Sequence, residues 1–419
     1  MNKKTKSCKI LTFLLLPLLF ACENAPTPLS GEKISIFNSE IIDENIEKRI
    51  VLEKPYINKQ WSSTGGNNEN NVGHLAGKKQ FKKLFSKSIG TVDDTNQILY
   101  KPVANKTTIF TIDGKLKITA TNINTGKTIW EMERIKNNDL IKFGALALDD
   151  NYLYAITNSA QLLKLNAKTG EIAYSKYFNT PLKSGLQICG NKLFFINDSN
   201  ELYIIDKQTG NKLYTHKSME EASSFIKGST PLCMDDKLVA TFSNGEIHML
   251  MSDTTTPIWL DSVYKISTSN LNNISDIVAN PIATKGLVIV KGYNDITKAL
   301  TLRDGKQIWE NSNGGITTPV ISNETMFDIN NNRVVSATDT KTGKQIWETR
   351  LNTYDMIFDP LLINNQLLIP VANGDIIKIN PYTGRRIETI NLTSKIDVSP
   401  IAVEDKLIIL SNATLRVFN

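Results

Sequence analysis

Residues 206–214 read Asp-Lys-Gln-Thr-Gly-Asn-Lys-Leu-Tyr, and the rest of the chain repeats this unit. An apolar run, 202–205, precedes it, and Tyr214 stands four residues after Gly210. An aspartate can bond to its own backbone two residues further on, and glycine adopts a positive φ without steric cost. The stretch therefore predicts a hairpin turn between two strands.

The turn and its aromatic residue recur at a nearly regular distance. Further turn glycines are Gly126, Gly170, Gly305, Gly343 and Gly384, and a degenerate copy around Thr255 has lost its glycine. Successive turns are 44, 40, 45, 50, 38 and 41 residues apart. A period near forty residues with several strands per unit is typical of propeller blades. The residues four places after the turn position, which we expect to pack between adjacent blades, are Trp130, Tyr174, Tyr214, Trp259, Trp309 and Trp347, with Glu388 in the last copy.

Each unit opens with a proline or a small residue, followed by an apolar run. The eight predicted openings are Pro102, Ala145, Pro181, Pro231, Pro281, Pro319, Pro360 and Pro400. The eighth unit has three strands before the chain ends, whereas the apolar stretch 81–89 has no turn before it. The sequence therefore predicts an all-β fold: an eight-bladed β-propeller with four-stranded antiparallel blades, closed by an N-terminal strand that completes the last blade. Seven blades are the alternative.

The N-terminus has the pattern of an export signal. Four lysines precede the apolar run 10–21, and the run ends in Leu19-Phe20-Ala21-Cys22, which resembles the lipobox of bacterial lipoproteins. We expect a signal peptide over 1–21, diacylglycerol on the thiol of Cys22 and a third acyl chain on its amine, which together anchor stably. A plain signal peptide cleaved elsewhere is the alternative. A lipidated tether over 22–60 and the propeller over 61–419 complete the predicted organisation.

The charge and the scattered cysteines and histidines exclude some functions. Without the four lysines of the signal, the 48 basic side chains fall to 44 against 42 acidic ones, which gives no electrostatic footprint for nucleic acid. His74, His216 and His248 lack metal-ligand spacing. Cys189 and Cys233 stand at similar places in neighbouring repeats, and we favour two small buried side chains there over a disulfide.

The turn-glycine-aromatic repeat resembles the pyrroloquinoline-quinone-type propeller repeat. Together with the lipobox, the stretch 28–34 (Pro-Leu-Ser-Gly-Glu-Lys-Ile) and the stretch 61–75 from Trp61 to Leu75, the chain is similar to BamB-like outer-membrane protein assembly lipoproteins. The resemblance implies a non-catalytic scaffold without a cofactor. It also implies a location on the periplasmic face of the outer membrane, where Glu23 replaces the aspartate associated with inner-membrane retention. The implied partners are BamA, the other subunits of the β-barrel assembly machinery and unfolded outer-membrane proteins, with the propeller as a monomer within the complex.

The resemblance also implies a docking site made of two inter-blade loops. One holds Phe225, Ile226 and Lys227 ahead of Gly228, with lysine where the family usually has arginine. The other holds Ser275-Asp276-Ile277-Val278, in which Asp276 matches the first acidic residue and Val278 replaces the second. Independently of the resemblance, both loops fall in the longest intervals between turns, and loops on a rigid scaffold commonly carry binding sites. Packing of Phe225 and Ile226 beneath their own loop is the alternative.

Two other functions compete with the scaffold. A periplasmic quinoprotein dehydrogenase dependent on pyrroloquinoline quinone would need a cluster of oxygen ligands for a metal and often uses adjacent cysteines. The sequence shows neither, so we predict no catalytic, cofactor or metal residues. A free-standing periplasmic propeller that binds a ligand or mediates adhesion would share the anchor and the ring. Blade edges could also accept substrate strands by β-augmentation.

Overall fold

The structure is a computed structural model that describes residues 49–90, 101–133, 144–157, 161–178, 180–221, 224–264 and 274–419. The signal sequence and Cys22 lie outside these residues. The described strands belong to a unit that runs from Lys48 to Asn419. Within the described residues, no helix is long and apolar enough to cross a membrane.

Eight sheets form the blades, and each contains four antiparallel strands that run in sequence order from the inside outward, except that an N-terminal strand is the outer strand of the last blade. The first strands are β4 (Val103–Asn105), β8 (Gly144–Leu148), β12 (Gln187–Cys189), β16 (Leu232–Met234), β20 (Ile282–Thr284), β24 (Val320–Ser322), β28 (Leu361–Ile363) and β32 (Ile401–Val403). The second strands are β5 (Thr108–Ile112), β9 (Tyr152–Thr157), β13 (Lys192–Ile196), β17 (Lys237–Thr241), β21 (Leu287–Lys291), β25 (Thr325–Ile329), β29 (Gln366–Pro370) and β33 (Lys406–Ser411).

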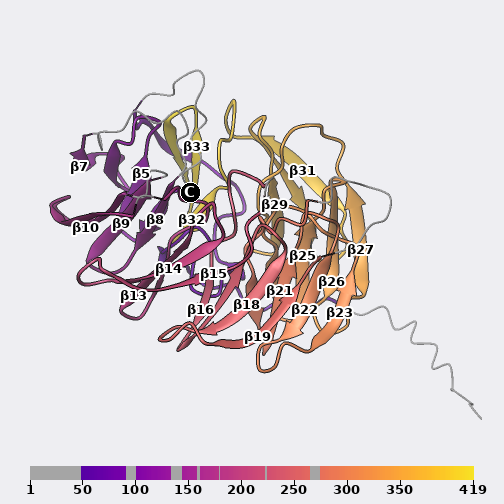
Figure 1. Ribbon diagram of the computed structural model, residues 1–419. Coiled ribbons are helices and arrows are strands. Elements are labelled where there is room, and N and C mark those ends of the chain that lie inside the picture. The colour runs from indigo at the N-terminus through magenta and orange to yellow at the C-terminus, as the bar shows by residue number, and fades with distance from the viewer. Residues whose placement is uncertain are drawn as a thin grey trace, which may run out of the picture. The chain divides into compact units, whose positions relative to one another are not determined.

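The third strands are β6 (Ile118–Asn122), β10 (Gln161–Asn166), β14 (Glu201–Asp206), β18 (Glu246–Met251), β22 (Thr297–Thr301), β26 (Val334–Asp339), β30 (Asp375–Ile379) and β34 (Thr414–Phe418). The outer strands are β7 (Thr128–Met132), β11 (Ile172–Tyr177), β15 (Lys212–Lys217), β19 (Pro257–Ser262), β23 (Gln307–Asn311), β27 (Gln345–Arg350), β31 (Arg386–Asn391) and, in the last blade, β3 (Lys83–Ser88). The first three strands of each blade are mostly buried, whereas the outer strands alternate between exposed and half-buried residues. The arrangement is a β-propeller, with its blades numbered 1 to 8 from β4 to β32 (Figure 1).

The first strands of neighbouring blades contact each other, as β4 does with β8 and β12 with β16, so they line the inside of the ring. Because the strands of a blade alternate in direction, the connections of the ring divide between two faces. We call the face with the inter-blade connections and the turns between second and third strands the loop face. The turn face carries the other two turns of each blade, including the repeated Thr-Gly turn.

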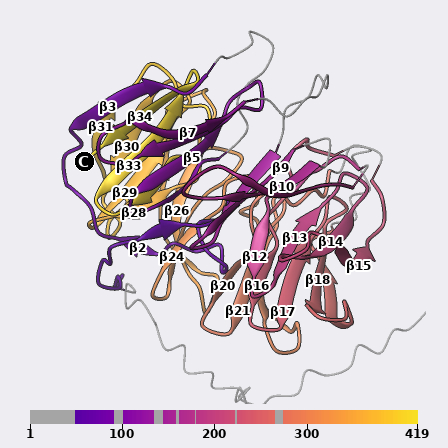
Figure 2. The same cartoon turned by 90° about the vertical axis from the view of Figure 1, so that its left-hand side faces the viewer.

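The ring closes as the sequence predicts. Strand β3 pairs with β34 in antiparallel register and becomes the outer strand of the blade formed by β32, β33 and β34. Figure 2 shows β3, from the N-terminal end, beside β34 at the C-terminal end. The prediction of eight four-stranded blades closed by an N-terminal strand is confirmed, and seven blades are excluded.

The repeated turn forms for the reason that the sequence suggests. Asp206 Oδ1 accepts hydrogen bonds from the backbone N–H groups of Gln208 (3.0 Å) and Thr209 (2.7 Å), and Gly210 has a φ of 71°. A Cβ atom at Gly210 would lie 2.7 Å from the ring of Tyr174 in the preceding blade. Glycine is therefore required both by the backbone conformation and by the close approach of the neighbouring ring.

The same contact between an aromatic ring and a turn glycine recurs from blade to blade. The pairs are Phe85 with Gly126, Trp130 with Gly170, Trp259 with Gly305, Trp309 with Gly343 and Trp347 with Gly384. The four tryptophans also donate Nε1–H to a backbone carbonyl of the next turn at 2.7–3.1 Å. The predicted packing between blades is confirmed at these positions. Phe85 lies in β3, so the N-terminal strand supplies the ring that faces blade 1.

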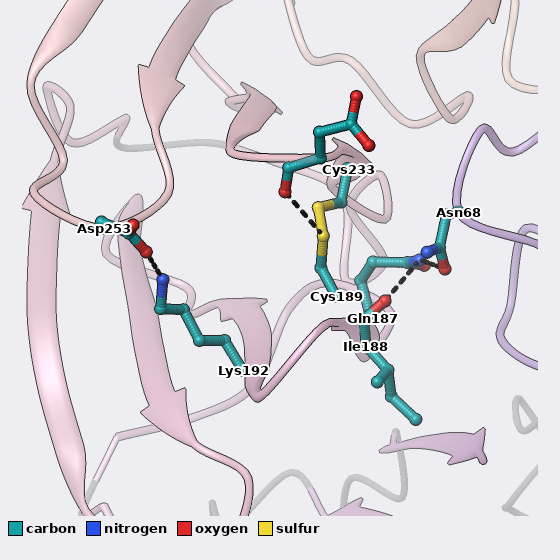
Figure 3. The surroundings of a disulfide bond; sticks show 8 residues. Asn68, Gln187, Ile188, Cys189, Lys192, Cys233 and Asp253 are labelled. Atoms are coloured by element: carbon teal, nitrogen blue, oxygen red, sulfur yellow. Dashed lines mark hydrogen bonds and ion pairs between the residues drawn. A yellow bond between two sulfur atoms is a disulfide. The ribbon is translucent and has the colours of Figure 1, made fainter. Parts of the chain in front are cut away.

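The seam between blades 3 and 4 departs from this pattern and corrects two predictions. Tyr214 is 44 % exposed and does not pack between blades, because the turn opposite it has Thr255 in place of a glycine. Cys189 and Cys233 form a disulfide, with their Cα atoms 6.1 Å apart, where we favoured two separate side chains (Figure 3). They pair because β12 and β16 lie side by side at the inside of the ring. An ion pair between Lys192 and Asp253 joins the same two blades.

One predicted opening is also wrong. Each first strand begins at or next to the predicted residue except in blade 3, where β12 begins at Gln187, six residues after Pro181. Before that strand, Leu182 forms a bridge with Asn197, and the N–H groups of Lys183 and Ser184 both point to the carbonyl of Ile196. The chain thus touches the end of β13 first and enters the ring only after Gly185.

The segment 58–75 lines the inside of the ring and contacts all eight blades. It adds β1 (Gln60–Trp61) beside β4. It also adds β2 (His74–Leu75), in parallel, beside β28 (Figure 2). Its other backbone and side-chain bonds reach Glu404, Leu148, Gln187, Cys233, Ala283 and Ile321. In sequence order, these contacts run through blades 8, 1, 2, 3, 4, 5, 6 and 7. Residues from Ile50 onward, within the predicted tether, also lie on the ring, where Ile50 is buried and Glu53 N–H donates to Ser322.

Candidate docking site on the loop face

The loop 224–228 connects blades 3 and 4 on the loop face, and three contacts hold it. Phe225 N–H donates to Asp276 Oδ2 at 2.7 Å, and Gly228 N–H donates to the carbonyl of Lys183 at 2.8 Å. The ring of Phe225 meets the ring of Tyr293 edge to face, with centroids 4.8 Å apart. The loop is therefore fixed near its two ends, at Phe225 and Gly228.

Asp276 lies beneath this loop and does not reach the surface. Its side chain is fully buried, and Oδ2 is 3.3 Å from the Nζ atom of Lys183, which is itself buried. Burial raises the pKa of Asp276 and lowers the pKa of Lys183, while the attraction between them opposes both shifts. Removing either partner would leave the other charged and buried, which is strongly destabilising. Asp276 thus positions Phe225 from beneath the loop.

The exposed part of the loop is Ile226 and its neighbour Lys227. The side chain of Ile226 is 60 % exposed, so the alternative in which it packs beneath its own loop does not describe this structure. Lys227 is half-buried and, among the described residues, forms no ion pair. Phe225, Ile226 and Lys227, which the sequence analysis assigns to a docking loop, thus lie on a loop with Ile226 at the surface. Sequence reasoning missed Lys183 and Tyr293, whose only signal was their place in the connections and turns of neighbouring blades.

Lys227 acts electrostatically on the carboxylate of Asp359, which precedes β28 on the same face. Burial alone would raise the pKa of Asp359. Lys101 at 3.2 Å, the charge of Lys227 and hydrogen bonds from Thr318 N–H and the Ser399 hydroxyl lower that pKa below its ordinary value instead. Asp359 forms its ion pair with Lys101, and Lys227 adds only a longer-range attraction.

Titratable side chains also gather at the contact between blades 3 and 4. No group of three or more His, Cys, Asp or Glu side chains in the described part of the chain could hold a metal ion. His216 Nε2 lies 2.8 Å from His248 Nδ1, and His248 Nε2 lies 3.2 Å from Glu246. The Ser218 hydroxyl donates to the same carboxylate and not to a histidine. This cluster joins blades 3 and 4.

Comparisons with known proteins agree with the ring. The curated outer membrane protein assembly factor BamB of Yersinia pestis is 21 % identical over 391 residues, which cover 91 % of this chain and 93 % of the relative. The crystal structure of BamB from Moraxella catarrhalis shares the fold, with a TM-score of 0.72, 16 % identity and coverage of 81 % of this chain and all of that one. A quinohemoprotein alcohol dehydrogenase from Comamonas testosteroni also shares the fold, with a TM-score of 0.66 and 11 % identity over 86 % of this chain and 80 % of its own.

Assembly factors and dehydrogenases thus share the propeller fold, so the fold does not distinguish between them. The family model described as outer membrane protein assembly factor BamB matches residues 113–349 and 293–413, which together span most of the ring. This match runs through the repeated turns and through both loops of the candidate docking site. The chain therefore belongs to the family of the outer membrane protein assembly factor BamB.

Proposed function

We propose that this chain is a non-catalytic scaffold lipoprotein of the outer-membrane β-barrel assembly machinery, which docks on the periplasmic domains of BamA. The observation that carries the proposal is the loop 224–228, which presents Ile226 and Lys227 from a fixed backbone. An exposed aliphatic side chain beside an available cation on a preorganised loop is suited to binding, because little freedom is lost when a partner docks. Family membership supports the assembly role.

Asp276 has a positioning role in this proposal. It holds the N–H of Phe225 and pairs with Lys183, so it fixes the loop without touching the partner. The lysine at position 227 meets a partner carboxylate as a point charge, whereas arginine would form a paired contact. We therefore expect the apolar contact of Ile226 to contribute more of the affinity than Lys227.

The anchor completes the proposal. Lipid on Cys22 would place the ring at the periplasmic face of the outer membrane, where BamA, the other subunits of the machinery and unfolded barrel proteins are present. The ring would bring these together as a monomer. Outer strands with open edges offer a route by which incoming strands could add to a blade.

Affinity purification of the full-length protein in mild detergent tests the proposal. Ile226→Asp and Lys227→Glu should reduce the recovery of BamA, by about tenfold for the first. Lys168→Glu, at an exposed position on the turn face, is the matched control and should recover BamA normally. Both loop variants should melt within the small range of ordinary surface changes. Normal recovery of BamA by both variants would contradict the docking site. Recovery of a redox partner, with tight binding of pyrroloquinoline quinone, would favour a dehydrogenase instead.

A further inference from the structure

A cavity of about 10 Å³ lies beneath the loop 224–228. Its wall is formed by residues of blades 3 and 4, by Gly228 of the loop itself and by Asp276 and Ile277 of the connection to blade 5. Every residue that lines the cavity is buried, so the cavity belongs to the interior of the ring. Its volume is about what one water molecule requires.

One carboxylate oxygen of Asp276 has no partner in the protein. Oδ2 accepts hydrogen bonds from Phe225 N–H at 2.7 Å and from Lys183 Nζ at 3.3 Å. Oδ1 is buried and accepts no hydrogen bond from the described residues. A buried acceptor left in this way costs free energy, and buried polar groups of folded proteins almost always have a partner. Because Asp276 lines the cavity, a donor can reach Oδ1 from there.

The ammonium group of Lys183, which lines the same cavity, has hydrogen-bonding capacity to spare. A lysine carries three N–H donors. Among the described residues, Nζ of Lys183 donates only to Asp276 Oδ2, although the side chain is 4 % exposed. The cavity is therefore bordered by an acceptor without a donor and by a donor group with too few acceptors.

A second buried lysine–aspartate pair of the ring shows what full satisfaction by protein atoms requires. Lys291 Nζ donates to Asp328 Oδ1 and to the carbonyl of Ile329, both at 2.5 Å. The other carboxylate oxygen, Asp328 Oδ2, accepts a hydrogen bond from Asn313 Nδ2 at 3.2 Å. Both oxygens of that carboxylate thus have protein donors, whereas the pair beneath the loop 224–228 leaves one oxygen without any.

The charges and the size of the cavity determine what can occupy it. A cation would lie against the ammonium group of Lys183, and an anion would lie against the carboxylate of Asp276, so the occupant is neutral. The small volume excludes an organic ligand. Water is neutral, fits the volume, and can donate to an oxygen while it accepts from an ammonium group.

We propose that one ordered water molecule occupies this cavity, donating a hydrogen bond to Asp276 Oδ1 and accepting one from Lys183 Nζ. The water completes the hydrogen bonding of the carboxylate that holds Phe225, so it is a structural part of the support beneath the loop 224–228. The site does not require that the loop binds BamA. The water site and the proposed function can therefore fail independently of each other.

A crystal structure of the full-length protein, at a resolution that shows ordered solvent, tests the proposal. The expected result is a single solvent peak about 2.7–3.2 Å from both Asp276 Oδ1 and Lys183 Nζ. The pair of Lys291 and Asp328 is the internal control, and no solvent peak should lie within that distance of its charged atoms. Direct contact of Lys183 Nζ with both oxygens of Asp276, a peak that touches neither atom, or a bound ion would overturn the proposal.

A double variant tests which side chains hold the water. Lys183→Met/Asp276→Leu removes both partners, so the solvent peak should be lost from its crystal structure. Lys291→Met/Asp328→Leu is the matched control and should keep the peak beside Lys183. Replacing both members of a buried pair avoids leaving a lone buried charge. Retention of the peak in the first variant would refute the assigned partners, and the structure of the unaltered protein decides the proposal even if that variant does not fold. Recovery of BamA remains a separate measurement, so a missing peak leaves the proposed function in place.

Discussion

Cys189 and Cys233 are bonded across the seam at which Thr255 replaces the turn glycine. Elsewhere, an aromatic ring of one blade rests on the glycine of the next, but Tyr214 remains exposed at this seam. The disulfide, the His216–His248 hydrogen bond and the Lys192–Asp253 ion pair join the blades there instead. The loop 224–228 connects the same two blades on the loop face.

Removal of the disulfide should destabilise the ring. The bond closes a loop with a sequence separation of 44, and a native bond of this kind contributes about 2–4 kcal/mol. The double variant Cys189→Ser/Cys233→Ser should therefore unfold at lower denaturant concentration than the oxidised wild type. Reduced wild-type protein is the matched control, because it keeps both sulfur atoms. Equal midpoints for the oxidised and reduced wild type would show that the bond contributes little.

The contribution of the contact between an aromatic ring and a turn glycine to stability can be measured separately from the cost of backbone strain. Gly343 has a φ of 70°, and a Cβ atom there would lie 2.7 Å from the Trp309 ring. Gly286 has a φ of 81° but no atom within 4 Å of such a Cβ. Both alanine variants share the strain of the left-handed conformation, roughly 1–2 kcal/mol. Gly343→Ala should cost about 1–3 kcal/mol more because the ring must move. Chemical unfolding measures the difference, and equal losses would mean that the ring adjusts freely.

The histidine pair predicts a loss of stability in mild acid. Burial lowers the pKa values of His216 and His248 below their ordinary value of 6.5. The unfolded chain therefore binds more protons than the folded one just below pH 6.5, and the free energy of unfolding falls as the pH falls through that range. Glu246, whose pKa is lowered, adds a similar loss in a more acidic range below its ordinary 4.5.

The variant His216→Gln/His248→Gln tests this assignment by melting temperature between pH 7.5 and pH 5.5. Its melting temperature should fall less with acidification than that of the wild type. His74→Gln is the comparison, because burial also lowers the pKa of His74, which bonds Glu53 and Asn365 in the inner segment. An unchanged slope in the double variant would assign the acid sensitivity to other groups.

The anchor is tested by fractionation. Cys22→Ala should prevent lipid attachment and release the protein into the soluble periplasmic fraction, because the lipid supplies the membrane affinity. Its folding should be unchanged, since the ring begins well after this residue. Retention of the variant in the membrane fraction would disprove the lipobox assignment.

The ring could be predicted because the sequence patterns that specify it lie within each repeat. Each turn, with its Asp or Asn, its glycine and its aromatic residue, is a short continuous stretch of sequence. The regular distance between these turns indicates the number of blades. The stretch 81–89 could be assigned to the last blade because that blade has only three strands of its own. The inner segment was not predictable, since Asn68 and Asn70 bond to residues more than a hundred positions away and show no alternation.

The site was predictable only in part for a similar reason. Ile226 and Lys227 could be placed on a surface loop from sequence spacing. The burial of Asp276 depends on Lys183, which is 93 positions away. The disulfide depends on two first strands lying side by side, and the cavity beneath the loop on residues brought together from separate blades. Such relationships arise between blades, and the pattern within one repeat does not contain them.

The segment 58–75 makes one circuit inside the ring and reaches all eight blades in order. A strand pairing at the outer edge would tolerate a missing or an added unit, but this lining has contacts for eight blades. It acts as an internal gauge of ring size, so a chain that lost or duplicated a repeat would leave either contacts without a blade or a blade without contacts. Repeat proteins commonly vary in length by gain and loss of units. This one carries, in its own N-terminal segment, the reason why its number of blades is fixed.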